Sequence, residues 1–181
     1  MESALAKTAW AIDPTHSEVQ FKVKHLVIST VTGSFGAFTA EINSNDEDFS
    51  GATAKFEAQI DSISTNNTDR DGHLKSADFF DAANHPTLNF ESTQFNKISG
   101  NDYEIVGNIT LRGVTKEIKL KAEYGGIMTD FYGNVKVGFE IEGKINRQDF
   151  GLTWSAVTEA GGIVVSDEVR LILNLQFAKQ A

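Results

Sequence analysis

The chain has 181 residues, of which 40% are hydrophobic and 23% charged, a composition typical of one globular domain. A formal net charge of −9, with no basic stripe, repels phosphate backbones and excludes nucleic acid from the expected partners. The absence of cysteine excludes disulfides, thiolate nucleophiles and zinc–thiolate sites, and no apolar run approaches the roughly 18 residues of a membrane span.

The first residues of the chain do not resemble a signal peptide. Met1–Lys7 lacks both the basic and the apolar region that such a leader requires. We therefore expect residues 1–9 to be an N-terminal extension or a tag remnant, and residues 10–181 to form a single domain. As written, the sequence predicts a cytoplasmic protein, and a processed or trimmed N-terminus would instead make it periplasmic.

Hydrophobic and polar residues alternate along most of the chain, which is typical of half-buried β-strands. Val19, Phe21 and Val23 begin the pattern, with Gln20 and Lys22 on the opposite face. The predicted strands fall, in chain order, at residues 19–25, 38–42, 54–60, 88–91, 103–111, 118–124, 135–141 and 169–177. Eight consecutive amphipathic strands favour an all-β fold, an antiparallel barrel, because closure removes exposed edges.

Two connections interrupt the alternation. Residues 62–86 are polar and carry short helical signatures at Arg70–Lys75 and Ser76–Asp81. A second irregular stretch, residues 147–162, precedes the last strand and is also expected to contain a short helical segment. Connections of this length are usually functional, so we expect a lid or a plug.

Small residues lie among large ones on the inward faces of the predicted strands. They are Ala40, Ala54, Ala58, Gly107, Ala122 and Gly143. Such a pattern indicates a cavity for one apolar ligand, but the same residues could accommodate phenylalanine rings in a solid core, and both readings stay open. In the first case, the cavity would be lined by Phe21, Val23, Phe38, Phe56, Phe90, Ile109, Leu120, Phe139, Leu171 and Leu173.

Motifs for catalysis, nucleotides or metals are incomplete. Gly138–Lys144 matches a phosphate loop, but Ile145 replaces the required serine or threonine. Asn67–Asp78 approaches a calcium loop, although Asp78 stands where a glutamate is expected. We predict no metal site, no cofactor and no catalytic residue. The alternative is an enzyme acting on a lipid or isoprenoid, with His25 as general base and Asp71 as its acidic partner.

A series of short strings, in this order, resembles the YceI-like family of bacterial lipid-binding proteins. The strings are Trp10–Ser17, Phe21–His25, Gly33–Phe35, Ile63–Thr65, Arg70–Leu74, Ser76–Asp81, His85–Pro86, Phe90–Ser92, Gly107–Thr115 and Arg147–Gly151. The resemblance implies an extended eight-stranded lipocalin-like barrel that binds a polyisoprenoid, an isoprenoid quinone, or a fatty amide or acid. It also implies a homodimer, and a role in isoprenoid quinone metabolism, transport or stress response.

The resemblance supplies no catalytic residues. Polar residues that could contact a ligand head group are therefore chosen by their position in the chain. These candidates are His25, Arg70, His73, Arg112, Arg147 and Asp149.

Overall fold

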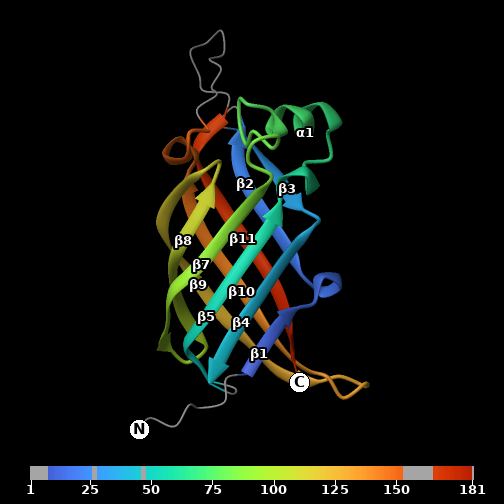
Figure 1. The fold of residues 1–181 in the computed structure, drawn as a ribbon, viewed down its shortest axis with the longest axis vertical. Helices are drawn as coiled ribbons and strands as arrows, with labels where there is room; N and C mark the ends of the chain where they lie inside the picture. Colours follow the sequence, from blue (N-terminus) through green and yellow to red (C-terminus); the bar gives the residue numbers. More distant parts are fainter. Residues whose placement is uncertain (1–7, 26–27, 46–47, 153–164, 181) are drawn as a thin grey trace.

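An antiparallel barrel of eight strand positions is seen in the computed structural model, which describes residues 8–25, 28–45, 48–152 and 165–180 (Figure 1). The strands are β1 (Thr8–Ile12), β2 (Glu18–His25), β3 (Ser29–Phe35), β4 (Phe38–Asn45), β5 (Asp48–Gln59), β6 (Ile63–Ser64), β7 (Thr87–Ser99), β8 (Asp102–Leu111), β9 (Val114–Thr129), β10 (Val135–Asn146) and β11 (Val165–Lys179). The helical segments are η1 (Pro14–His16), η2 (Ile60–Ser62), α1 (Thr68–Lys75) and η3 (Arg147–Phe150). The predicted all-β barrel with short helical segments is thus confirmed.

The barrel closes through β1, which pairs with β4 on one side and with β11 on the other. From β4 the sheet continues through β5, β7, β8, β9 and β10 back to β11. Each of these neighbouring pairs is antiparallel, as the alternating pattern and short turns predict. Thr8 and Ala9, which the sequence analysis assigned to an N-terminal extension, lie in β1.

Beyond β1, the chain continues along β11 as β2, after an interruption at η1. The side chain of Asp13 caps η1 by accepting a hydrogen bond from the Thr15 backbone N–H at 3.1 Å. β2 then pairs with β3, and β3 with the short β6. Because β1 has only five residues and η1 separates it from β2, the alternation of hydrophobic and polar residues becomes visible only at Val19.

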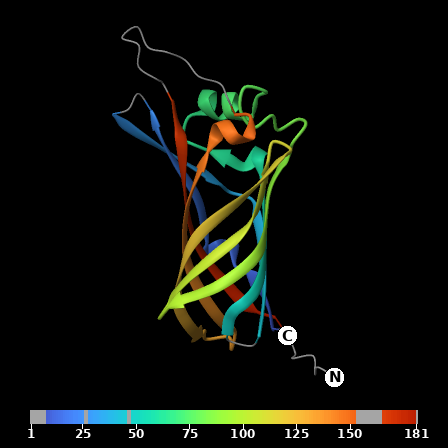
Figure 2. The same ribbon diagram turned by 90° about the vertical axis from the view of Figure 1, so that its left-hand side faces the viewer.

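The two ends of the barrel differ. The turns β4–β5, β7–β8 and β9–β10 lie at one end, together with β1 and the C-terminal part of β11 (Figures 1 and 2). The β8–β9 turn and α1 lie at the other end. We call these the hairpin end and the α1 end.

The long polar connection contains one α-helix rather than two helical segments. The Asn67 side chain accepts a hydrogen bond from the Arg70 backbone N–H at 2.9 Å and begins α1. Ser76–Asp81, predicted to be helical, instead forms consecutive turns, in which the backbone N–H of Phe80 donates to the Leu74 carbonyl. That second helical prediction was wrong because these turns carry Phe79 and Phe80 back toward the barrel core.

Seven aromatic side chains fill the hairpin end of the barrel. We call them the aromatic plug: Trp10, Phe49, Phe95, Tyr103, Tyr124, Phe139 and Phe177. Phe49 is at the centre, with its ring centroid 5.1 Å from that of Phe139 and 5.5 Å from that of Trp10. Edge-to-face and tilted packing of this kind stabilises a core beyond the burial of area alone. This end of the interior is therefore solid.

Within the described residues, no helix is long and apolar enough to cross a membrane.

Candidate functional site

Between the aromatic plug and α1, the barrel interior contains apolar cavities. The central one has a volume of about 90 Å³ and lies against the Phe139 side of the plug. An upper cavity of about 80 Å³ follows toward the α1 end, and Phe21, Phe35, Leu88 and Leu171 line both. Apolar side chains make up most of both linings, apart from Gln20, Glu41 and Lys55 in the central cavity and Arg147 in the upper one. Such surfaces give water few hydrogen-bond partners.

A third pocket, of about 350 Å³, lies beside α1 and carries polar groups. It shares Phe21, Leu74 and Phe79 with the upper cavity, and Phe21 lines all three spaces. The interior is thus a row of adjoining spaces, closed by the plug at one end and polar at the other. We call the third pocket the mouth.

Most of the predicted lining residues lie on the walls of this row. The nine are Phe21, Val23, Phe56, Phe90, Ile109, Leu120, Phe139, Leu171 and Leu173. Phe38 does not line these three spaces: it is half-buried and stacks on Phe56, with ring centroids 6.2 Å apart. The two readings of the interior that the sequence left open apply to different halves, since the hairpin end is solid and the rest is hollowed.

Arg70 and His73 of α1 both line the mouth. Arg70 donates from Nε to Thr65 Oγ1 and from Nη2 to the Thr65 carbonyl, each at 2.7 Å. Asp71 fixes the same residue, because its Oδ1 accepts from the Thr65 backbone N–H at 2.8 Å and from its hydroxyl at 2.6 Å. These bonds dock α1 onto the chain just after β6.

His73 holds the turns that follow α1. Its Nε2 lies 2.8 Å from Asp78 Oδ2, and its ring packs edge-to-face on Phe79 with centroids 5.1 Å apart. Phe79 is buried and lines both the mouth and the upper cavity. The contact therefore connects a titratable side chain at the mouth to the apolar wall.

The hypothetical acid–base pair of the enzyme reading gains no support. Asp71 is engaged with Thr65 as a structural acceptor. His25 ends β2, where its backbone pairs with Ser29 and Val165, and its side chain lies outside the described part of the chain.

The two other arginine candidates bind backbone carbonyls. Buried Arg147 donates to the carbonyls of Leu152 at 2.7 Å, Ser166 at 2.9 Å and Val165 at 3.2 Å. Burial lowers the pKa of its guanidinium from the ordinary value, while Asp167 opposes the shift. Arg147 lines the upper cavity, but these bonds make it a latch between η3 and the start of β11.

Arg112 and Asp149 do not lie on the walls of these three spaces. Arg112 is in the β8–β9 turn and donates from Nη1 to the Gly151 carbonyl at 2.5 Å. Asp149 is an exposed residue of η3. The structure thus brings Arg70 and His73 together at the mouth and leaves these two apart from it.

Several residues of the site were missed by sequence analysis. Leu74, Phe79 and Phe80 line the upper cavity, and Lys24 and Asp69 line the mouth. A signal was present, because these three apolar residues stand out in an otherwise polar connection. The near-match to a calcium loop has a different cause, since Asn67 is the N-cap of α1.

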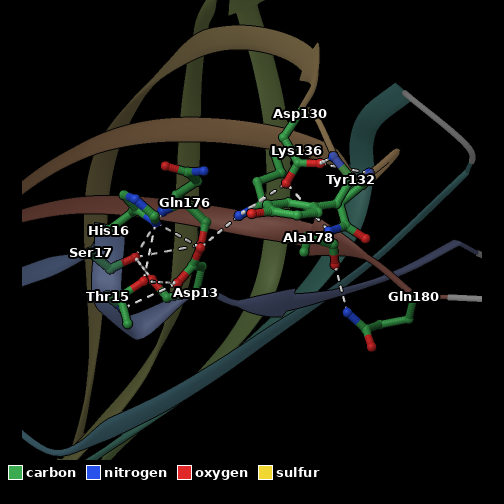
Figure 3. A network of polar contacts seen from close by, with 11 residues as sticks. Asp13, Thr15, His16, Ser17, Asp130, Tyr132, Lys136, Gln176, Ala178 and Gln180 are labelled. Atoms are coloured by element: carbon green, nitrogen blue, oxygen red, sulfur yellow. Dashed lines mark hydrogen bonds and ion pairs between the residues drawn. The ribbon is translucent and has the colours of Figure 1, made fainter.

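A separate polar network lies at the hairpin end, where β1 pairs with β11 and closes the barrel (Figure 3). We call this β1–β11 junction the seam. Lys136 Nζ lies 2.7 Å from Asp13 Oδ2 and 3.8 Å from Asp130 Oδ2. The hydrogen bond from Lys136, with others from Thr15 and His16, lowers the pKa of Asp13 far below its usual range. Asp13 in turn raises the pKa of Lys136. This network joins β10 to the loop after β1 and lies at the end opposite the mouth.

Comparison with known proteins identifies related sequences over nearly the whole chain. A YceI-like domain is matched over residues 10–177. A UPF0312 protein of Pectobacterium carotovorum is 38% identical over 165 residues, which cover 91% of this chain and 82% of that protein. A UPF0312 protein of Staphylococcus aureus is 32% identical over 172 residues, which cover 94% and 98% of the two chains.

Solved structures share the barrel. The YCEI protein of Campylobacter jejuni has a TM-score of 0.76 and 32% identity, and covers 87% of this chain and 90% of its own. A polyisoprenoid binding domain from Saccharophagus degradans has a TM-score of 0.68 over 94% and 98% of the two chains, and its 17% identity shows the common fold alone. Since the domain match spans residues 10–177 and relatives exceed 30% identity, the chain belongs to the YceI-like family.

Proposed function

We propose that the barrel binds one long apolar ligand and carries or stores it, without turning it over. The ligand class is a polyisoprenoid, an isoprenoid quinone, or a fatty amide or acid, in quinone metabolism, transport or stress response. The observation that carries this proposal is the row of apolar spaces between the aromatic plug and the polar mouth. The polyisoprenoid binding domain of Saccharophagus degradans, which shares the fold, supports the ligand class.

The energetics suit such a ligand. Each methylene moved from water into an apolar site contributes about 0.8 kcal/mol. Ten of them contribute about 8 kcal/mol, equivalent to a dissociation constant of about 1 μM before the cost of ordering the chain. Affinity therefore needs few polar contacts, and the tail provides it.

The polar end of the ligand belongs at the mouth. Arg70 and His73 are the candidates on its wall, and Lys24 adds a second cationic side chain there. Arg147 contributes to the upper wall, with its guanidinium directed to carbonyls. In this arrangement the tail extends toward Phe139, and the head group stays near α1.

The first test is extraction of the freshly purified protein with organic solvent, followed by mass spectrometry of the extract and native mass spectrometry of the intact chain. A stoichiometric prenyl, quinone or acyl species supports the proposal and names the ligand. A ligand-free mass, together with failure to bind added isoprenoids, contradicts it. The same native spectrum tests the expected homodimer.

Adjacent residues of β11 provide a matched pair of variants. Leu173 lines the central cavity, whereas its neighbour Asn174 is exposed on the outer face. Leu173→Gln places an amide in the apolar wall and should lower ligand occupancy about tenfold or more, while Asn174→Gln should leave it unchanged. Phe139 is a poorer choice, because a polar residue there would also disrupt the plug.

Equal occupancy in the folded Leu173→Gln protein and in Asn174→Gln would contradict the position of the tail. Turnover of a lipid that is lost in His25→Ala would instead support the enzyme reading.

A further inference from the structure

The β9–β10 hairpin extends beyond the barrel wall (Figure 1). Its tip carries exposed apolar side chains. Phe131 is fully exposed, Tyr132 is 91% exposed, and Met128 is 64% exposed. Ile127 adds a fourth, partly exposed apolar side chain on β9. We call Ile127, Met128, Phe131 and Tyr132 the hairpin tip. A concentration of this kind on a monomer surface marks an interaction site more often than chance exposure does.

The tip is held in one shape by its own hydrogen bonds. Asp130 Oδ1 accepts from the backbone N–H groups of Tyr132 and Asn134, each at 2.9 Å. The Asp130 backbone N–H donates to the Asn134 carbonyl at 2.9 Å, and Gly133 adopts a positive φ of 81° that closes the turn. Phe131 and Tyr132 are therefore presented on an ordered loop.

The hairpin is also nearly free of charge. From Tyr124 to Val135 the sequence contains a single charged residue, Asp130, although 23% of the whole chain is charged. The Asp130 carboxylate is hydrogen-bonded within the turn and lies 3.8 Å from Lys136 Nζ. Lys136 also pairs with Asp13, at 2.7 Å. Moving the tip into a less polar medium thus requires the desolvation of one carboxylate that is hydrogen-bonded within the turn.

We infer that the hairpin tip inserts Phe131 and Tyr132 into the interfacial region of a phospholipid bilayer and docks the barrel on it. Aromatic side chains with an apolar ring favour that depth of a membrane. Two such rings present about 400 Å², and Met128 and Ile127, which are 64% and 41% exposed, add a smaller area. The tip therefore offers less than the about 800 Å² that each partner buries in a standard protein interface. A projecting, uncharged tip of this size suits a fluid surface better than a rigid protein partner.

The docking surface is distinct from the ligand site. The tip lies at the hairpin end, on the far side of the aromatic plug from the mouth (Figures 1 and 2). Docking there leaves the mouth at the opposite end of the barrel from the contact. The inference therefore does not depend on the proposed ligand, and its failure would leave that proposal intact.

Sedimentation with phosphatidylcholine vesicles tests the inference. We expect the wild-type chain to sediment with them, with little dependence on salt, since the contact is apolar. Replacing part of the lipid with phosphatidylglycerol should weaken binding at low salt, because the chain carries a net charge of −9. The double variant Phe131→Ser with Tyr132→Ser should lower the bound fraction about tenfold or more.

Ile98 provides the control, since it is 63% exposed at the end of β7, at the same end of the barrel but away from the tip (Figure 1). Ile98→Ser should retain wild-type binding. Phe131→Trp adds an independent reading, a blue shift of its fluorescence on vesicles and quenching by brominated lipid. Absence of sedimentation, or equal binding by the wild type and the double variant, overturns the inference. A dimer in solution that the double variant dissolves would assign the tip to a second copy and overturn it as well.

Discussion

The free volume of the central cavity can be tested by substitution at Ala54. Ala54 lines this cavity from β5, while Ala52, two residues earlier on the same strand, is buried and does not line it. Ala54→Leu and Ala52→Leu add the same three carbon atoms at neighbouring inward positions. They should have opposite effects on stability.

The magnitudes follow from the space available. A cavity needs roughly 10–15 Å³ of free volume to hold one water molecule. The central cavity has about 90 Å³, so it accepts three added carbon atoms without displacing its walls. Each added carbon contributes about 0.8 kcal/mol when buried, or about 2.4 kcal/mol in total. Even with some strain, Ala54→Leu should be neutral or stabilising by about 1 kcal/mol. At Ala52 the same group overpacks the core and should cost about 1–3 kcal/mol.

Urea unfolding of the delipidated proteins measures both effects, and mass spectrometry of the extracts measures ligand occupancy. Ala54→Leu should lower occupancy because it narrows the path of the tail, whereas folded Ala52→Leu should retain it. A loss of 2 kcal/mol or more in Ala54→Leu, about equal to that in Ala52→Leu, would refute the reasoning. The interior would then be solid along its whole length.

Three further predictions concern the contacts that hold the barrel closed. Asp13→Ala should lower the free energy of unfolding by about 1 kcal/mol at pH 7, while Asp149→Ala, at an exposed site, should not. Lys136 lowers the pKa of Asp13 below its ordinary 3.8, so the ionised carboxylate contributes its full stabilisation above about pH 4. In acid unfolding of the wild type, this stabilisation should be lost as the pH falls further. Arg147→Lys should cost about 2–3 kcal/mol in urea unfolding, since one ammonium group cannot reach the carbonyls that the guanidinium holds; a change under 0.5 kcal/mol would contradict the latch. Ser44→Ala removes the acceptor 2.8 Å from Trp10 Nε1 in the plug and should cost about 1–3 kcal/mol by thermal unfolding, whereas a neutral result would mean that the indole finds another acceptor.

Alternation of hydrophobic residues located most of the barrel strands, because each has one face in the core and one in water. β3 was not among the predicted strands, since it consists largely of serine, threonine and glycine. Its glycine has a packing reason: a Cβ at Gly33 would lie 2.1 Å from Phe21 Cζ across the strand pair. Gly33 weakens the strand pattern in the sequence, but the structure requires glycine there because the Phe21 ring occupies the place of a Cβ. That ring lines all three interior spaces.

The polar candidates could not be sorted by sequence. Arg147 and Arg112 resemble ligand-binding residues in type and position, yet their partners are backbone carbonyls, and Arg112 meets Gly151 across 39 residues. Such a pairing depends on the path of the main chain around the rim, which no side-chain pattern encodes. The apolar wall was easier to predict, because its residues follow from strand register alone.

The hairpin end of the barrel is closely packed, whereas the α1 end contains the mouth. A cavity lowers stability because its walls lose packing contacts, and an interior hollowed along its whole length would lose them everywhere. Here the aromatic plug, centred on Phe49 and sealed by the Trp10–Ser44 bond, packs the hairpin end tightly, and the Asp13–Lys136 pair crosses the seam at that same end. The α1 end is instead held by polar contacts, those of Arg70 and Asp71 with Thr65 and those of Arg147 with main-chain carbonyls. We therefore expect the proposed ligand to exchange at the mouth, while the close packing at the hairpin end keeps the strands there paired.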